Sequence, residues 1–280
     1  MAGSSGKQTR SQKLRQNMIN MMYLVFIAML ALQISKEVLG TLGILSEDME
    51  KSTAEVETSI DSAYNIINQN SNQDYYKIPS EELPKLKEIT DEYVNFLESL
   101  KDSLIGIDDN NFMIDVEYVD DNGNEKISQR RDYQVMDKSN YLDEMFFIND
   151  GVTDKGQEFI DYFKSFSDKV ETVLDSIKAR DSRTVQSNYG FSTALSNLSL
   201  RFDYPIDDQV VNRDGIKEDW IYYNYEKFPL VASLSKFTKI QSDIRSVEYE
   251  ILNSLVSKTK DRQLSFDSKS TLLETDKQAY

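Results

Sequence analysis

The sequence predicts a mainly α-helical fold, in which a single N-terminal transmembrane helix is followed by an α-helical bundle with a small β-hairpin insertion. Three observations lead to this prediction. Residues 16–35 contain no charged side chain. Apolar residues recur at helical spacing along most of the chain after Lys36. Residues 112–135 change to the two-residue alternation that is typical of strands.

The uncharged segment has the length and the flanking charges of a membrane anchor. Twenty helical residues reach about 30 Å, the thickness of the hydrocarbon core of a bilayer. The first acid of the chain is Glu37, and four cations precede the segment: Lys7, Arg10, Lys13 and Arg15. Such cations are retained on the cytoplasmic side. We therefore expect a cytoplasmic tail at 1–15, a transmembrane helix at 16–36 in the inner membrane, and a periplasmic location for the rest of the chain.

A cleavable signal peptide has the same polarity and is the alternative to an anchor. The apolar core of a signal peptide is typically about 7–15 residues long, shorter than the uncharged segment here. The end of the segment, from Ala31 to Ser35, offers no good pair of small residues for cleavage. Both observations favour an uncleaved anchor.

After the membrane, apolar residues keep the spacing of four and three that is typical of a coiled coil. The helix is expected to continue to about Asn70 and to pair in parallel with a second copy, forming a homodimer. The predicted dimer seam consists of Val38, Leu42, Leu45, Met49 and Val56. Gly40 and Gly43 lie where the helix leaves the membrane, and each costs a helix about 1 kcal/mol relative to alanine. They form either a slightly weakened turn or a hinge.

The periplasmic bundle domain is expected to span residues 37–258. Its second helix is predicted to begin at Ser80, as the N-cap, and to end at Gly106, and the hairpin at 112–135 turns at 120–124. Further helices are predicted at 154–180, around Phe191 to Leu198, and from Pro229 to about Lys258. Residues 259–280 are polar and show no helical period. We expect them to form a linker or the start of a truncated next domain.

The composition of the chain argues against several classes of function. The net charge is −16 and the first fifteen residues contribute +4, so the rest carries −20, a poor match for nucleic acid. The chain contains no cysteine and no histidine. Disulfides, thiolate metal sites, the commonest general base and the commonest metal ligand are therefore excluded. We predict that the protein is not an enzyme and has no catalytic residue, cofactor or metal.

Two stretches of the sequence are similar to a known family. They are RQNMINMMYLVFIAMLALQISKEVL, from Arg15 to Leu39, and WIYYNYEKFPLVASLSKFTKIQSDIRSVEYEIL, from Trp220 to Leu252. Both resemble the GldM/PorM family of gliding-motility and type IX secretion proteins. The first match is specific, because its order of Asn, Met, Tyr and Ala is followed at once by Ser-Lys-Glu-Val. Between the two stretches, the likeness rests on helical pattern alone.

The resemblance implies a subunit of an inner-membrane motor driven by the proton motive force. In this family the helix, paired with a copy of itself, lies inside a ring of a multi-spanning partner of the GldL/PorL type. Together they drive periplasmic type IX secretion and gliding. Further periplasmic domains of the family, beyond this chain, would contact outer partners.

The membrane segment indicates how such a motor would couple to ions. Residues 16–35 contain no Asp or Glu, so the ring partner would have to supply any proton-carrying membrane carboxylate. Arg15 lies nearest the apolar core, and the resemblance places it at the functional arginine of the family. Its alternative role is that of one among four cations that set the topology. Gln16, Asn20 and Tyr23 share a helix face, and with Arg15 they are the predicted ion-coupling and ring-contact residues.

Two other functions fit an anchored helical bundle. The protein could be a single-pass periplasmic sensor, although a tail of fifteen residues is too short to hold a signalling domain and a partner would have to signal. It could also be a passive scaffold in the inner membrane. Copurification of a multi-spanning protein with a buried acid distinguishes a motor subunit from a scaffold.

Overall fold

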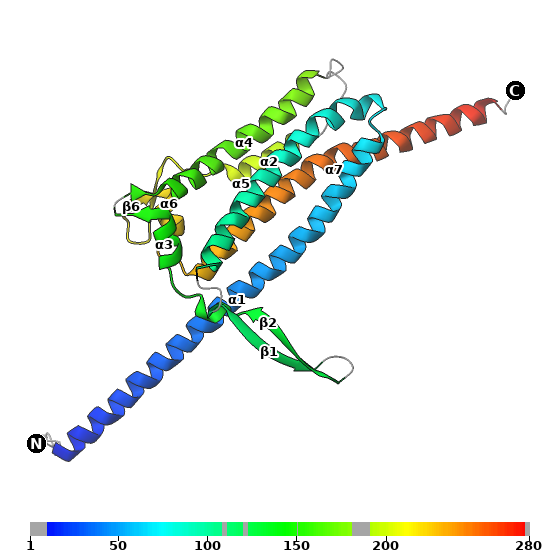
Figure 1. The fold of residues 1–280 in the computed structure, drawn as a ribbon. Helices are drawn as coiled ribbons and strands as arrows, with labels where there is room; N and C mark the ends of the chain where they lie inside the picture. The colour runs from blue at the N-terminus through cyan, green and yellow to red at the C-terminus, as the bar shows by residue number, and fades with distance from the viewer. Residues whose placement is uncertain (1–9, 108–110, 120–122, 150, 181–190, 278–280) are drawn as a thin grey trace, which may run out of the picture.

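The computed structural model describes residues 10–107, 111–119, 123–149, 151–180 and 191–277, while the side chains of residues 10–14, 30–34 and 258–277 lie outside this description (Figure 1). The elements, in chain order, are α1 (Arg10–Gln69), α2 (Asp74–Ile105), β1 (Met113–Val119), β2 (Glu125–Arg131), the 3-10 turn η2 (Tyr133–Val135), α3 (Asn140–Phe146), β3 (Phe147–Ile148), β4 (Gly151–Val152), α4 (Asp154–Arg180), α5 (Phe191–Phe202), β5 (Gln209–Val211), β6 (Lys217–Asp219), α6 (Trp220–Tyr225) and α7 (Leu230–Lys277).

The long helices form a bundle around one continuous core. In Figure 1, α1 packs along α7, α2 lies against both α7 and α4, and α5 lies against α4 and α7. Each helix has a buried apolar stripe because its large apolar residues recur every three or four positions. The stripe of α4 consists of Phe159, Phe163, Phe166, Val170 and Leu174, and that of α2 includes Leu83, Leu86, Leu97, Leu100 and Leu104.

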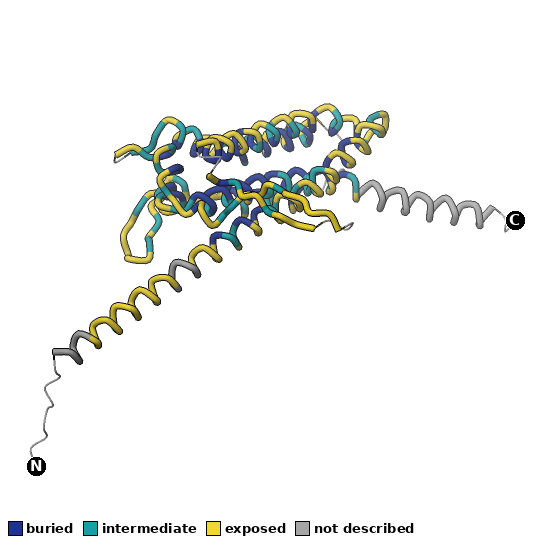
Figure 2. The backbone as a smooth tube through the Cα atoms, turned by 60° about the horizontal axis from the view of Figure 1, so that its bottom comes forward, coloured by how far each residue is buried: buried dark blue, intermediate teal, exposed yellow. Residues whose placement is uncertain are grey.

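The N-terminal part of α1 leaves the bundle as an arm. Among the side chains that the structure describes, Leu39 is the first buried one of this helix, and those before it are exposed. We call residues 10–38 the arm. Figure 2 shows the arm projecting from one end of the bundle, and Figure 1 shows the last part of α7 leaving at the other end.

Among the residues whose side chains are described, no helix is long and apolar enough to cross a membrane. The transmembrane helix predicted at 16–36 includes residues 30–34, whose side chains lie outside the described part of the chain. Of the predicted cytoplasmic tail, residues 1–9 also lie outside it.

The mainly α-helical class and the hairpin insertion are confirmed. α1 ends at Gln69, next to the predicted end at Asn70, and α4 has the predicted bounds. β1 and β2 pair antiparallel within 112–135, with Met113 opposite Arg131 and Val119 opposite Glu125. Gly123 follows residues 120–122, which lie outside the described part, and has a φ of 81°, which glycine adopts at little cost.

Two predicted helix ends are wrong. Ser80 is not an N-cap, because α2 begins at Asp74 and Ser80 Oγ donates a hydrogen bond to the Lys77 carbonyl at 2.9 Å within the helix. The buried Tyr76 fixes the first turn, so tertiary packing holds a helix through Pro79. The last helix does not end near Lys258 but continues to Lys277. That extension contains no glycine or proline, and adding a residue to a formed helix avoids the cost of nucleation.

Candidate functional site

The four predicted ion-coupling residues all lie on the arm. Their side chains are exposed, and Tyr23 exposes 66% of its surface. Gln16 Nε2 donates a hydrogen bond to Asn20 Oδ1 at 3.1 Å, so these two side chains lie on the same helix face. Tyr23 follows Asn20 by three residues and extends this polar face. Arg15 directly precedes Gln16, at the start of the uncharged segment.

The five residues of the predicted dimer seam lie in two environments. Leu42 and Val56 are partly buried against the core of their own bundle, and Met49 is also half-buried. Val38 and Leu45 are exposed, by 54% and 57%. Further along α1, at Ile60 and Ile67, the same helical period is buried inside the bundle. The chain's own packing therefore leaves only the first part of the seam open to a second copy.

Gly43 makes a close approach between α1 and η2. A Cβ at this position would lie 2.0 Å from Cγ of Tyr133, whereas a Cβ at Gly40 would meet only the Gln134 side chain at 3.8 Å. Tyr133 Oη donates a hydrogen bond to Glu47 Oε1 at 2.9 Å. The turn after the hairpin is thus fastened to α1 at the junction of arm and bundle, and the helix is continuous at both glycines.

Replacing Gly43 with Ala is expected to lower the free energy of unfolding by about 1–3 kcal/mol, because the Tyr133 ring must move and η2 loses its close packing against α1. Gly40→Ala is the matched control, and we expect it to raise stability by about 0.5–1 kcal/mol through helix propensity alone. Denaturant unfolding of the full chain in detergent measures both. Equal gains in the two variants would contradict the packing of Tyr133 on Gly43.

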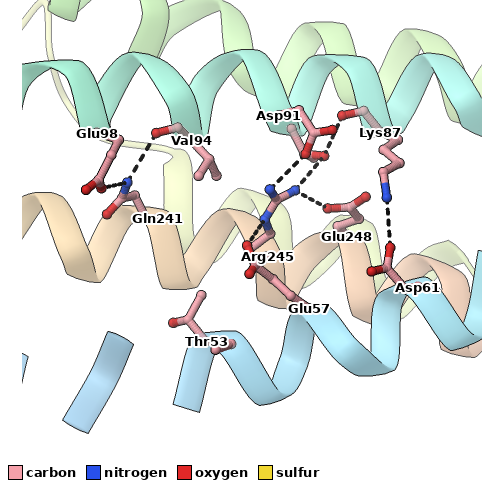
Figure 3. A network of polar contacts seen from close by, with 12 residues as sticks. Thr53, Glu57, Asp61, Lys87, Asp91, Val94, Glu98, Gln241, Arg245 and Glu248 are labelled. Carbon is pink, nitrogen blue, oxygen red and sulfur yellow. Dashed lines mark hydrogen bonds and ion pairs between the residues drawn. The ribbon is translucent and has the colours of Figure 1, made fainter. Parts of the chain in front are cut away.

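A cluster of ionised side chains joins three helices inside the bundle (Figure 3). Arg245 of α7 has a side chain only 11% exposed and pairs with three carboxylates, which we call together the Arg245 cluster. Its nitrogens lie 3.0 Å from Glu57 of α1, 2.8 Å from Asp91 of α2, and 2.9 Å from Glu248 on the next turn of α7. One guanidinium group therefore ties α1 and α2 to α7.

Glu248 is the fully buried member of this cluster. Burial raises the pKa of its carboxyl above the ordinary value for glutamate, and the charge of Arg245 opposes that rise. Tyr64 of α1 donates a hydrogen bond to Glu248 Oε1 at 2.9 Å. Burial together with the neighbouring Glu248 carboxylate raises the pKa of the Tyr64 hydroxyl, so Tyr64 stays a neutral donor. The Glu248 carboxylate is thus held by Arg245 of its own helix, by Tyr64 of α1 and by the hydroxyl of Thr90 of α2.

A second polar cluster lies two turns nearer the arm. Lys101 of α2, with a side chain 5% exposed, lies 2.8 Å from Glu50 of α1 and 3.1 Å from Glu98. Gln241 of α7 accepts a hydrogen bond from Lys101 at 3.3 Å and donates one to Glu98 at 2.9 Å. The same three helices are therefore tied together twice along their length.

Neither cluster is evident from the sequence. A signal was present in α7, where Thr238, Gln241, Arg245 and Glu248 repeat every three or four residues beside the apolar stripe. The partners come from α1 and α2, at sequence distances of more than 130 residues, so no local pattern reveals them. Both clusters hold helices in register. Among the described residues, no group of carboxylates is arranged to hold a metal ion.

Comparison with known proteins gives the family. A family model for the GldM N-terminal domain matches residues 37–258, which include the end of the arm and the bundle with both polar clusters. The chain belongs to the GldM family. Membership of the GldM family makes the protein a component of the gliding-motility and type IX secretion machinery, with a structural and motility role in the cell envelope. A comparison with curated proteins finds no match.

The resemblance stated from the sequence is therefore confirmed. The GldM match begins at residue 37, so the predicted dimer seam and both polar clusters lie inside the matched region. Arg15, Gln16, Asn20 and Tyr23 precede the matched region, and their roles stay predictions.

Proposed function

We propose that this GldM-family protein is an inner-membrane subunit of a motor driven by the proton motive force. With a multi-spanning ring partner of the GldL/PorL type, it transmits energy to the periplasmic secretion and gliding machinery. Residues 1–15 lie in the cytoplasm, residues 16–36 cross the inner membrane, and the bundle lies in the periplasm. Two copies of the chain pair in parallel through α1.

The observation that carries this proposal is the continuity of α1. The helix runs for 60 residues from Arg10 to Gln69, without a break where arm and bundle meet. At about 1.5 Å per residue it is about 90 Å long. Its backbone hydrogen bonds join the two parts stiffly, so that a displacement of the arm displaces the bundle. A passive anchor does not need this continuity, since a flexible linker would hold the bundle equally well.

Transmission also requires that α1 be firmly attached to the other helices of the bundle. The two polar clusters provide this attachment, because two acids of α1 pair with cations of other helices: Glu50 with Lys101 of α2, and Glu57 with Arg245 of α7. Toward the C-terminal end of α1, Ile60 and Ile67 are buried in the core. Force on α1 therefore reaches α2 and α7 through both charge pairs and apolar contacts.

The coupling step uses Arg15 and a carboxylate of the ring partner. An arginine beside a buried carboxylate favours the charged form of that acid. When the helix and the ring move relative to each other, the acid leaves the guanidinium and takes up a proton, and it releases the proton when it returns. Gln16, Asn20 and Tyr23 form the adjoining contact face, because polar groups at membrane depth need protein or water partners.

Replacing Arg15 with Ala is expected to abolish energy-dependent secretion while leaving membrane insertion intact, because Lys7, Arg10 and Lys13 still retain the tail. Arg15→Lys should restore function only in part, since lysine keeps the charge but lacks the planar fork. The matched control is Arg10→Ala, with insertion, complex assembly and secretion all assayed in cells carrying the variant. Equal and mild effects of the two alanine variants would refute the coupling role.

A further inference from the structure

The β1–β2 hairpin projects from the bundle next to the arm (Figure 1). Most residues of its two strands are exposed, and only Met113, Val116 and Ser128 are half-buried. The exposed residues include apolar ones: Ile114, Tyr118, Val119 and Ile127. An isolated two-stranded hairpin is only marginally stable in water, and stable sheets bury one face. The exposed apolar residues therefore indicate that a partner covers this hairpin.

The two faces of the hairpin differ in charge. Residues directly opposite in the register share a face, and faces alternate along each strand. Arg131 lines a groove with Glu98 and Lys101, so the face that contains Arg131 is turned at its base toward the bundle. The other face, which we call the outer face, consists of Ile114, Val116 and Tyr118 on β1 opposite Arg130, Ser128 and Lys126 on β2. The outer face is apolar and positively charged, and its central pair, Val116 and Ser128, is half-buried. The face that contains Arg131 also exposes two apolar side chains, Val119 and Ile127, but it carries three acids: Asp115, Glu117 and Glu125.

The base of the hairpin is held beside a complementary surface of α1. Phe112 and Asp132 close the hairpin with a backbone hydrogen bond of 2.8 Å, and Tyr133 then binds Glu47 of α1. At this level α1 exposes Ile44 by 59% together with Leu45. Three acids lie on the same exposed side: Glu37, Asp48 and Glu55. Of these three, Asp48 pairs with the neighbouring Lys51, at 3.3 Å. This side of α1 is apolar and negatively charged.

The dimer seam by itself is too small to hold two copies of the bundle. A stable interface buries about 800 Å² on each partner. Leu42 and Val56 are already partly buried against the chain's own core, which leaves Val38, Ile44 and Leu45 as the exposed aliphatic residues of this stretch. Three aliphatic side chains provide well under the required area, so a second element must contribute.

We propose that the hairpin of each copy clasps α1 of the second copy. The outer face packs on Ile44 and Leu45 of that copy, and Arg130 and Lys126 face its Glu37, Asp48 and Glu55. In a parallel pair, both hairpins start at the level of the exposed α1 stretch, so each can reach across with the same contacts. This inference rests on the parallel dimer of the proposed function and names its main contact.

Crosslinking between two differently tagged, coexpressed full-length copies tests this contact in membranes. The chain has no cysteine, so single substitutions give unambiguous products. One copy carries Val116→Cys, on the outer face, and the other carries Ile44→Cys. We expect this pair to form a mixed-tag product at several times the yield of the control pair, in which Glu117→Cys on the opposite face replaces Val116→Cys. Arg130→Glu should reduce the yield, and Asp48→Arg in the second copy should restore it.

Leu45→Cys, alone in the chain, separates failure of the clasp from failure of the dimer. Suppose that the Leu45→Cys residues of two copies crosslink to each other, while the Val116→Cys and Glu117→Cys variants crosslink to Ile44→Cys equally or not at all. The clasp is then refuted and the dimer stands. If Leu45→Cys also fails to crosslink, the parallel dimer of the proposed function is refuted and the clasp with it. Thermal unfolding of each variant shows that the bundle remains folded, as expected for substitutions outside the core.

Discussion

Replacing Arg245 with Met is expected to lower the free energy of unfolding by about 3–5 kcal/mol, the usual cost of leaving a buried charge without its partner. Glu248 has no exposed surface, so its carboxylate cannot recover the lost interaction from water. Glu57 and Asp91 are partly exposed and regain hydration, so they contribute less to the loss. α1 and α2 also lose the guanidinium group that ties them both to α7.

The loss in Arg245→Met should depend on pH with a defined sign. Burial already raises the pKa of Glu248, and removal of Arg245 raises it further. A carboxyl whose pKa is higher in the folded state destabilises that state above the folded pKa, and the penalty is relieved as pH falls through it. The difference in stability between variant and wild type should therefore be larger at about pH 8 than at about pH 5.

Denaturant unfolding at both pH values, on the full chain in detergent, measures this loss. Lys178→Met is the matched control, because Lys178 pairs with Asp175 at 2.9 Å on the exposed surface of α4 and such pairs contribute less than about 1 kcal/mol. The double variant Arg245→Met with Glu248→Gln should recover much of the loss, since the buried charge is gone and Tyr64 keeps an acceptor. A loss in Arg245→Met no larger than that in Lys178→Met would contradict the role of the Arg245 cluster.

The helices could be predicted from sequence where one apolar period is long and uninterrupted. α4 matches its predicted bounds, and α1 ends within one residue of its predicted end. The hairpin was predictable because its strands alternate and its turn contains Asn and Gly. The start of α2 and the end of α7 were not, because packing of Tyr76 and extension of a formed helix outweigh the local signals at Ser80 and Lys258. The short elements α3, β3 and β4 contain too few residues to show a period.

The candidate site also contains residues that could be singled out from the sequence and residues that could not. Arg15 could be singled out by its place next to the uncharged segment together with the family resemblance. Gln16, Asn20 and Tyr23 could be singled out as polar residues that share one face inside that segment, and the roles of all four stay predictions. The Arg245 cluster could not, because its members come from three helices and each looks like an ordinary surface charge in its own helix. Gly43 was visible as a glycine in a helix. The requirement for glycine there comes from the ring of Tyr133, ninety residues further along the chain, which leaves no room for a Cβ.

The dimer seam shows why a heptad pattern alone does not name a partner. The same period continues from Val38 to Ile67. In the bundle, its later positions are buried against the chain's own helices, as at Ile60 and Ile67, and only the first ones stay exposed. A heptad pattern reports that a helix face is buried, and it does not distinguish burial by a second copy from burial within the chain.

The central claim is that α1 transmits movement from the arm to the bundle as one stiff helix. Two insertions of equal length between Lys36 and Glu37, just before the buried residue Leu39, test it. Seven alanines add about two helical turns and about 10 Å, and they keep each face of the arm within about 20° of its original direction. A flexible insertion of seven glycine and serine residues adds the same number of residues and breaks the mechanical connection.

Both insertions are expected to leave membrane anchoring and assembly with the ring partner intact, because the arm and the bundle are each unchanged. The measurement is energy-dependent secretion in cells that carry either variant in place of the wild-type protein. We predict that the alanine insertion retains secretion and that the flexible insertion abolishes it. Secretion at the wild-type level with the flexible insertion would contradict the claim, because a bundle held only by a flexible linker cannot receive movement through α1.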